Sequence, residues 1–191
     1  IVAVTLMYST TGGLRSVVAT DLVQFGIAIV ASGAFAWIVV EHVGGLSSLT
    51  QRLYDQFSVS SGYPLTGNEI LAFTPFGAKD ATIMVLLVYG FQWLLQMNAD
   101  GTGYLAQRSM ACRSDNDART AAVVFTVAQV VLRSLIWLPL ALGLLLLFPP
   151  PPGMMDAHFI AAREFTFVQG IDELLPPGVK GLMVVGMMAA L

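Results

Sequence analysis

The sequence predicts an all-α integral membrane protein, and its composition and charge distribution lead to this fold class. Of the 191 residues, 56% are hydrophobic and only 11% are charged, whereas an ordinary soluble domain carries about 25% charged residues. Residues 22–40 contain no charge, and a segment of about 20 apolar residues is long enough to cross a bilayer. Such a chain cannot cover a soluble surface with polar groups, so we expect a lipid bilayer as its partner.

The charge balance and the cysteine content exclude several classes of function. The formal net charge is −3, whereas a nucleic-acid-binding protein needs a basic surface, so we expect no nucleic-acid partner. A single cysteine, Cys112, cannot form an internal disulfide. The sequence shows no pairing of a nucleophile with a base and no metal-ligand motif. We therefore expect no enzyme, no catalytic residue and no cofactor-binding residue.

The apolar runs predict four helices in a single transmembrane domain, residues 1–191. Both ends of the chain fall inside apolar runs, so we expect it to be an internal piece of a larger membrane protein. Within the loops, short amphipathic helices are expected at Leu46–Phe57 and around His158–Val168. The expected helices are residues 15–42, 81–112 (broken near 98–103), 118–148 and 178–191, and the long loops are residues 43–80 and 149–177.

Basic residues predict the orientation of these helices. Arg108, Arg113 and Arg119 cluster in the short connection after the broken helix, and Arg15 lies in another short connection. Short loops rich in arginine and lysine remain on the cytoplasmic side. The two long loops are then expected on the external side.

A polar break interrupts the second apolar segment, in the sequence "QMNADGTGY" (residues 96–104). Asn98, Asp100 and Thr102 occur here together with two glycines, before an apolar helix is expected to resume at Tyr104. In lipid, unwound backbone is tolerated only where it lines a buried or water-filled cavity. Secondary transporters use such discontinuous helices to bind ions and substrates. The alternative is a helix that ends at the membrane interface, with Asp100 in headgroup water.

Arg133 is the second polar feature, because it lies near the centre of the apolar segment Ala121–Phe148. A charge at the bilayer centre costs about 2.5 kcal/mol or more, and it indicates a functional site by default. Gln129 is expected one turn earlier on the same helix face. Asp100 is a candidate ion-pair partner for Arg133, and the alternative role of Arg133 is a structural salt bridge inside the bundle. Asp21, at the start of the first full helix, also suits the helix dipole alone.

Three stretches together resemble the sodium:solute symporter family. "YSTTGGLRSVVATDLVQ" (residues 8–24) resembles its GGL-x-AVV-x-TD-x-x-Q signature. "QRSMACRSDNDAR" (residues 107–119) is similar to its QR-x-x-A-x-[KR]-S-x-x-x-A-[KR] loop. "LPPGVKGLMVVGMMAA" (residues 175–190) resembles the LP-x-G-x-KGL-x-x-AG-x-x-AA entry to a later helix. The three occur in the family's order, and the resemblance covers essentially the whole chain.

The resemblance implies a LeuT-type fold of two inverted five-helix repeats with two broken central helices. The chain would then hold the end of the fourth core helix, the fifth, the broken sixth, the seventh and the start of the eighth. Residues 98–103 would be the break of the sixth helix, the place that the hydrophobicity of the chain indicates independently.

The resemblance also implies site residues. Ala190 matches a backbone-carbonyl ligand of the sodium site, and Asp21 matches an aspartate that binds a second sodium ion or lines the cation exit route. The substrate-contacting asparagine of sodium/galactose cotransporters becomes Thr102, and their gating tyrosine is Tyr104. Their sugar-contacting lysine becomes Gln129, with Arg133 one turn further on. These departures weigh against a sugar, and Arg133 would suit a carboxylate-bearing solute.

These expectations define a function. The chain is expected to belong to a multi-pass transporter of the bacterial inner membrane that couples Na⁺ to the symport of a small polar organic solute by alternating access. Na⁺ would be the coupling ion, and Asn98, Asp100, Thr102, Tyr104, Gln129 and Arg133 would face the solute. The alternatives are a transporter-like sensor domain coupled to a signalling kinase and a structural subunit of a membrane complex.

Overall fold

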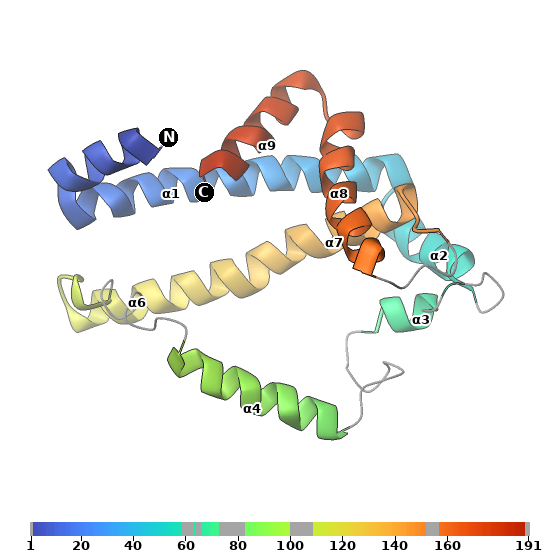
Figure 1. Cartoon of the computed structure of the whole chain (residues 1–191), viewed down its shortest axis with the longest axis horizontal. Coiled ribbons are helices and arrows are strands. Elements are labelled where there is room, and N and C mark those ends of the chain that lie inside the picture. The colour runs from blue at the N-terminus through green and yellow to red at the C-terminus, as the bar shows by residue number, and fades with distance from the viewer. Residues whose placement is uncertain are drawn as a thin grey trace. The chain divides into compact units, whose positions relative to one another are not determined.

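The computed structural model describes residues 2–58, 63, 66–72, 83–99, 109–151 and 157–189, and the regular elements among them are all helical. The chain forms two compact units, residues 1–49 with 136–191 and residues 50–135. Two of the described helices, Arg15–Val43 and Asp115–Leu147, are long and apolar enough to cross a membrane. Figure 1 shows the helices along the chain. The all-helical, membrane-compatible fold class is therefore confirmed, and the LeuT-type arrangement stays a prediction.

The first unit begins with α1 (Val2–Val43), which is broken once, at Gly13. Gly13 has φ 60° and ψ −161°, a conformation that glycine adopts without steric cost. The Ser16 hydroxyl donates a hydrogen bond to the Gly13 carbonyl oxygen at 3.0 Å and so satisfies a group that the break releases from the helix. Figure 1 shows the segment before Gly13 turning back along the rest of α1. The connection expected before residue 15 is thus a turn centred on one glycine.

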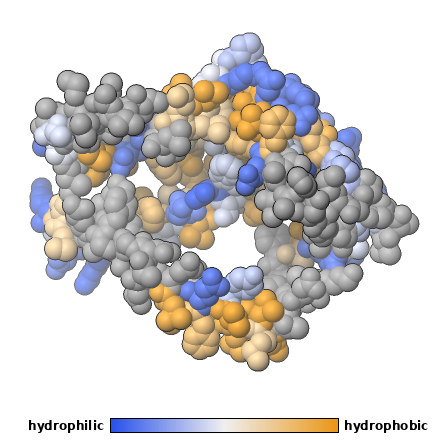
Figure 2. All heavy atoms as spheres, in the orientation of Figure 1, coloured by the Kyte–Doolittle hydropathy of each residue, from blue (hydrophilic) through white to orange (hydrophobic). Residues whose placement is uncertain are grey.

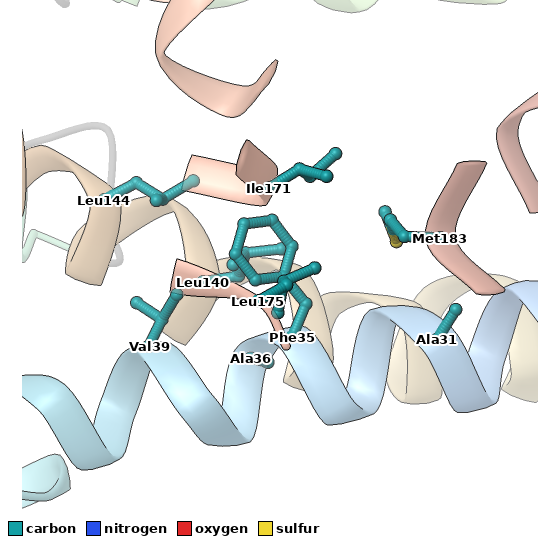
Figure 3. Close-up of a cluster of buried hydrophobic side chains, with 9 residues drawn as sticks. All are labelled: Ala31, Phe35, Ala36, Val39, Leu140, Leu144, Ile171, Leu175 and Met183. Atoms are coloured by element: carbon teal, nitrogen blue, oxygen red, sulfur yellow. The ribbon is translucent and has the colours of Figure 1, made fainter. Parts of the chain in front are cut away.

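The core of this unit lies where α1 meets three later helices: α7 (Arg133–Leu147), α8 (Ala157–Leu174) and α9 (Pro177–Ala189). Figure 3 shows the side chains of this core pointing toward one another. Phe35 and Val39 of α1 are completely buried, so the surfaces of these two apolar side chains are inaccessible to solvent. The buried cluster consists of Ala31, Phe35, Ala36, Val39, Leu140, Leu144, Ile171, Leu175 and Met183.

Phe167 of α8 joins α1 and α7 through its ring. It meets Phe35 edge-on with ring centroids 5.7 Å apart, and it stacks on Trp137 at 5.5 Å with an interplanar angle of 16°. Offset-stacked and edge-to-face pairs are the favourable aromatic geometries. One aromatic side chain of α8 therefore contacts an aromatic side chain on each of two other helices.

Two glycines allow the backbones in this core to approach closely. A Cβ on Gly143 of α7 would overlap Cγ1 of Val39. A Cβ on Gly170 of α8 would lie 2.5 Å from Cδ2 of Leu144 and 3.1 Å from the Phe35 ring. Both positions are buried, so larger residues would push the helices apart.

The segment 149–177, which the sequence predicted to be a loop with a short helical stretch, contains the 18-residue helix α8. Thr166, Gly170 and Ile171 are buried, and Phe167 and Leu174 are half-buried, so one face at helical spacing packs on the core. This apolar face explains why the helix continues past Val168. The helical stretch predicted around His158–Val168 thus lies within α8, which continues to Leu174.

The second unit contains part of α2 (Leu46–Gln56) and the short helix α3 (Gly67–Ile70). The helix α2 lies where the sequence predicted a short amphipathic helix. The Gly67 N–H donates to the Phe57 carbonyl oxygen at 2.8 Å, and the Cα of Gly67 lies so close to α2 that a Cβ would be 2.9 Å from the Leu53 carbonyl oxygen. Residues 43–80, predicted to be mainly loop, thus hold two helices in contact.

The helix α4 (Ile83–Ala99) and the helix α6 (Asp115–Thr126) also belong to the described part of this unit. Figure 2 shows hydrophobic residues on the outer surface of α4, and the side chains of Ile83, Met84 and Leu95 are each 70% exposed. Ser114 caps α6, because its side chain accepts a hydrogen bond from the Asp117 N–H at 3.2 Å. This cap explains why the helix begins three residues before the predicted start at 118.

Candidate functional site

Arg133 lies inside a continuous helical segment, Asp115–Leu147, that is apolar enough to cross a membrane. This segment consists of α6, the π-helix η2 (Val127–Leu132) and α7, and Arg133 is the first residue of α7. It lies 18 residues after Asp115 and 14 residues before Leu147, which is near the middle of the segment. If this segment crosses a membrane centred on its middle, the Arg133 charge lies at the depth where lipid penalises it most.

The π-helix is a feature that the sequence analysis missed. The Arg133 N–H donates to the Ala128 carbonyl oxygen, five residues back, in place of the usual four. A short π-helix places one extra residue in a turn of an α-helix. Such turns occur frequently at functional sites. The β-branched residues Val127, Val130 and Val131 fit an α-helix less well than straight-chain residues, but such residues also occur in ordinary membrane helices. The sequence therefore carries only a weak signal for it.

Gln129 and Arg133 belong to this widened part of the helix, and both side chains are exposed. Val130 beside them is 60% exposed and Leu135 is 67% exposed. In the described part of the chain, a salt bridge joins Lys180 to Asp172 and does not involve Arg133. The predicted pairing of Arg133 with Asp100 stays a prediction, because Asp100 lies outside the described residues.

The helix α4 ends at Ala99, directly before Asp100. Asn98 is the penultimate residue of α4, and its backbone is helical. Residues 100–108 lie outside the described residues, and with them Thr102 and Tyr104. The break predicted at residues 98–103 falls mostly outside the described residues and stays a prediction.

Asp21 and Ala190 are the two positions predicted for sodium. Asp21 is a partly exposed residue of α1. Beside it, the Thr20 hydroxyl points back to the carbonyl oxygens of Ser16 and Val17, at 3.0 and 2.8 Å. Ala190 lies outside the described residues and directly follows Ala189, the last residue of α9.

The contacts of α9 show what holds the helix that leads to Ala190. Met183 is buried in the core, and a Cβ on Gly186 would lie 3.6 Å from the Cα of Ala28 in α1. Small residues at this crossing let the two helix backbones approach closely. The main packing partner of α9 is therefore α1, the helix that carries Asp21.

No three His, Cys, Asp or Glu side chains within the described part of the chain lie close enough together to hold a metal ion.

Comparison with known proteins decides the family. The model of the sodium:solute symporter family matches residues 1–191, the whole chain. The chain belongs to this family. It is also similar to a sodium/mannose cotransporter of Bos taurus, with 24% identity over 210 residues that cover 99% of this chain and 34% of the relative. The chain thus spans about a third of the length of this symporter. No solved structure matches the chain.

Membership of the sodium:solute symporter family helps to interpret the two long apolar helices. The two candidate spans fit a membrane transporter. A symporter couples a solute to sodium, and the polar groups of its membrane helices are where such coupling takes place.

Proposed function

We propose that the protein containing this chain is a sodium-coupled symporter that carries a small polar organic solute inward by alternating access. The match of the sodium:solute symporter family to all 191 residues is the observation that carries this proposal. The mid-membrane arginine supports it, since an intramembrane charge on an exposed helix face needs a polar partner.

In the proposed mechanism, sodium favours the outward-open state of the helical bundle. A ligand shifts a conformational equilibrium only by its difference in affinity for the two states. Sodium bound by the Ala190 carbonyl and groups outside this chain would hold α9 in the solute-ready arrangement. Solute binding would then allow the bundle to rock toward the inward-open state.

The proposed solute site uses the end of α4 and the widened part of the long helix. Asn98, Asp100, Thr102 and Tyr104 would supply donors and acceptors around the break. Gln129 and Arg133 would face them from the next span in the LeuT-type arrangement. Asp21 would bind a second sodium ion or line the route by which sodium leaves.

The solute class follows from the chemistry of these residues. The relative of Bos taurus is a sodium/mannose cotransporter by name, but a neutral sugar has no carboxylate to match a guanidinium. Arg133 would instead pair in a bidentate manner with a carboxylate. Monocarboxylates and amino acids are therefore the first solutes to test, with sugars as the comparison.

Transport assays on the full-length protein test this function. Proteoliposomes that contain it are supplied with radiolabelled monocarboxylates, amino acids and sugars in sodium buffer. Uptake of at least one solute should be lost when K⁺ or choline replaces Na⁺. Uptake that is the same in all three buffers would disprove sodium coupling.

A further inference from the structure

At two helix ends of the first unit, a proline stands where a continuing helix would supply the N–H donor for a carbonyl oxygen. In an α-helix, the carbonyl of one residue accepts a hydrogen bond from the N–H four residues later. The fourth residue after Phe148 is Pro152, and the fourth residue after Asp172 is Pro176. Since proline has no N–H, neither carbonyl can be satisfied by continuing its helix.

A basic side chain of the next helix donates to each of these carbonyls. Arg163 of α8 donates through Nη1 to the Phe148 carbonyl oxygen at 2.8 Å. Lys180 of α9 donates through Nζ to the Asp172 carbonyl oxygen at 2.7 Å and to Oδ1 of the same residue at 2.6 Å. The helix α8 is therefore bonded to the end of α7 in its first half and to the start of α9 at its end.

Electrostatics favours both bonds. The C-terminal end of a helix carries a partial negative charge, so a cation is stabilised there. The Asp172 carboxylate adds negative charge at the end of α8, where it would be unfavourable without Lys180. Burial lowers the pKa of the Arg163 guanidinium, but arginine remains charged in proteins.

The connection between α8 and α9 is short, so only a few hydrogen bonds determine the angle between the two helices. Leu175 and Pro176 join the two helices. Leu175 is buried in the core, and the Lys180 N–H donates to the Pro176 carbonyl oxygen at 2.9 Å. The Lys180 side chain then adds the bond that reaches back to the last turn of α8. Beyond this corner, α9 is held by its crossing with α1.

We propose that Lys180 is a positioning residue for sodium binding, because its bond to the Asp172 carbonyl sets the direction in which α9 leaves the corner. This inference rests on the proposed function, in which Ala190, directly after α9, supplies a carbonyl ligand to sodium. Without the bond, α9 can change its angle to α8, and the ligand is no longer held at its place. Lys180 acts through α9 and does not touch the ion.

Sodium binding to the purified full-length protein tests the proposal without knowledge of the solute. Binding of radioactive sodium is measured by scintillation proximity for Lys180→Met, which keeps the apolar stem, and for Lys180→Arg, which keeps the donor. The Lys180→Met variant should bind sodium about fivefold more weakly, the effect of removing one partly exposed charge-assisted bond. The Lys180→Arg variant should stay near wild type. Arg119→Gln, which removes an exposed basic residue of α6, is the charge-matched control and should bind as wild type does.

One further variant separates the carbonyl from the carboxylate. Asp172→Asn keeps the carbonyl acceptor, so it should weaken sodium binding less than Lys180→Met. The carbonyl assignment is overturned if Asp172→Asn reproduces the whole defect. Sodium affinity unchanged in Lys180→Met would overturn the proposal itself.

A distance measurement separates failure of this inference from failure of the proposed function. Spin labels are attached at the exposed positions Phe165 of α8 and Val184 of α9 in a background without other cysteines. Lys180→Met should broaden the distribution of label distances, whether or not the protein binds sodium. A wild-type protein without saturable sodium binding would refute the proposed function. An unchanged distance distribution would refute the positioning role of Lys180.

Discussion

Gly143 of α7 lies so close to Val39 of α1 that a methyl group on the glycine would overlap the Cγ1 atom of the valine. Both residues are buried, and Val39 is completely inaccessible to solvent. The contact sets how closely these two helices approach, and the core of the first unit is built around that approach.

We expect Gly143→Ala to destabilise the folded protein. Overpacking a tight core costs typically about 1–3 kcal/mol, and thermal unfolding in detergent measures the loss. A second change, Val39→Ala, should recover part of it by removing the atom that the new methyl group meets. Gly181→Ala is the control, because a Cβ there meets nothing within 4 Å. Equal stability of the Gly143→Ala and Gly181→Ala variants would contradict the close contact between Gly143 and Val39.

We expect Arg163→Met to weaken the junction between α7 and α8. The variant leaves the Phe148 carbonyl without its donor, and a hydrogen bond to a charged group contributes about 1.5–3 kcal/mol when well shielded. Because the guanidinium is partly exposed, a loss near the lower end of that range is expected in thermal unfolding. Glu164→Gln changes an exposed neighbour on α8 and serves as the control. Equal unfolding temperatures for the two variants would contradict the role given to Arg163.

The elements with a clear hydrophobic period could be predicted from the sequence. The charge-free run 22–40 predicted the main part of α1. The four prolines after Phe148 predicted the end of α7. These signals are local, since each depends on a few neighbouring residues.

The features that the sequence could not predict depend on contacts distant along the chain or on small differences in backbone geometry. Arg163 reaches a carbonyl oxygen 15 residues earlier, and nothing in the sequence around either residue indicates this bond. The length of α8 depends on how its apolar face packs against α1 and α7. The π-helix before Arg133 differs from an α-helix by one residue in a turn, which is too small a change to alter the hydrophobic pattern.

The proposed solute role of Arg133 predicts a defect in affinity. Arg133→Gln should raise the KM for the transported solute about tenfold or more, as expected for the loss of a charge-assisted bond, while the amount of folded protein in the membrane stays similar. Uptake kinetics and quantitative immunoblotting measure the two quantities separately. Arg119→Gln provides the control for the loss of a positive charge. A fall in folded protein with an unchanged KM would instead assign Arg133 a structural role.

The residues after α4 give a second test of the solute site. Thr102→Ala and Tyr104→Ala should each lower transport or solute affinity, because both remove a hydroxyl group from the proposed break. Ser109→Ala, at a helical residue after the proposed break, removes a hydroxyl group outside the proposed site and serves as the comparison. Normal kinetics in both the Thr102 and Tyr104 variants would remove these positions from the proposed site.

Coupling between sodium and solute is the central claim, and concentrative uptake tests it most directly. Proteoliposomes that contain the full-length protein are given an inward sodium gradient and the radiolabelled solute found in the uptake screen. The proposed symport predicts that internal solute rises above the external concentration and falls back as the gradient dissipates. Uptake that only reaches the external concentration, at the same rate with and without the gradient, would contradict it.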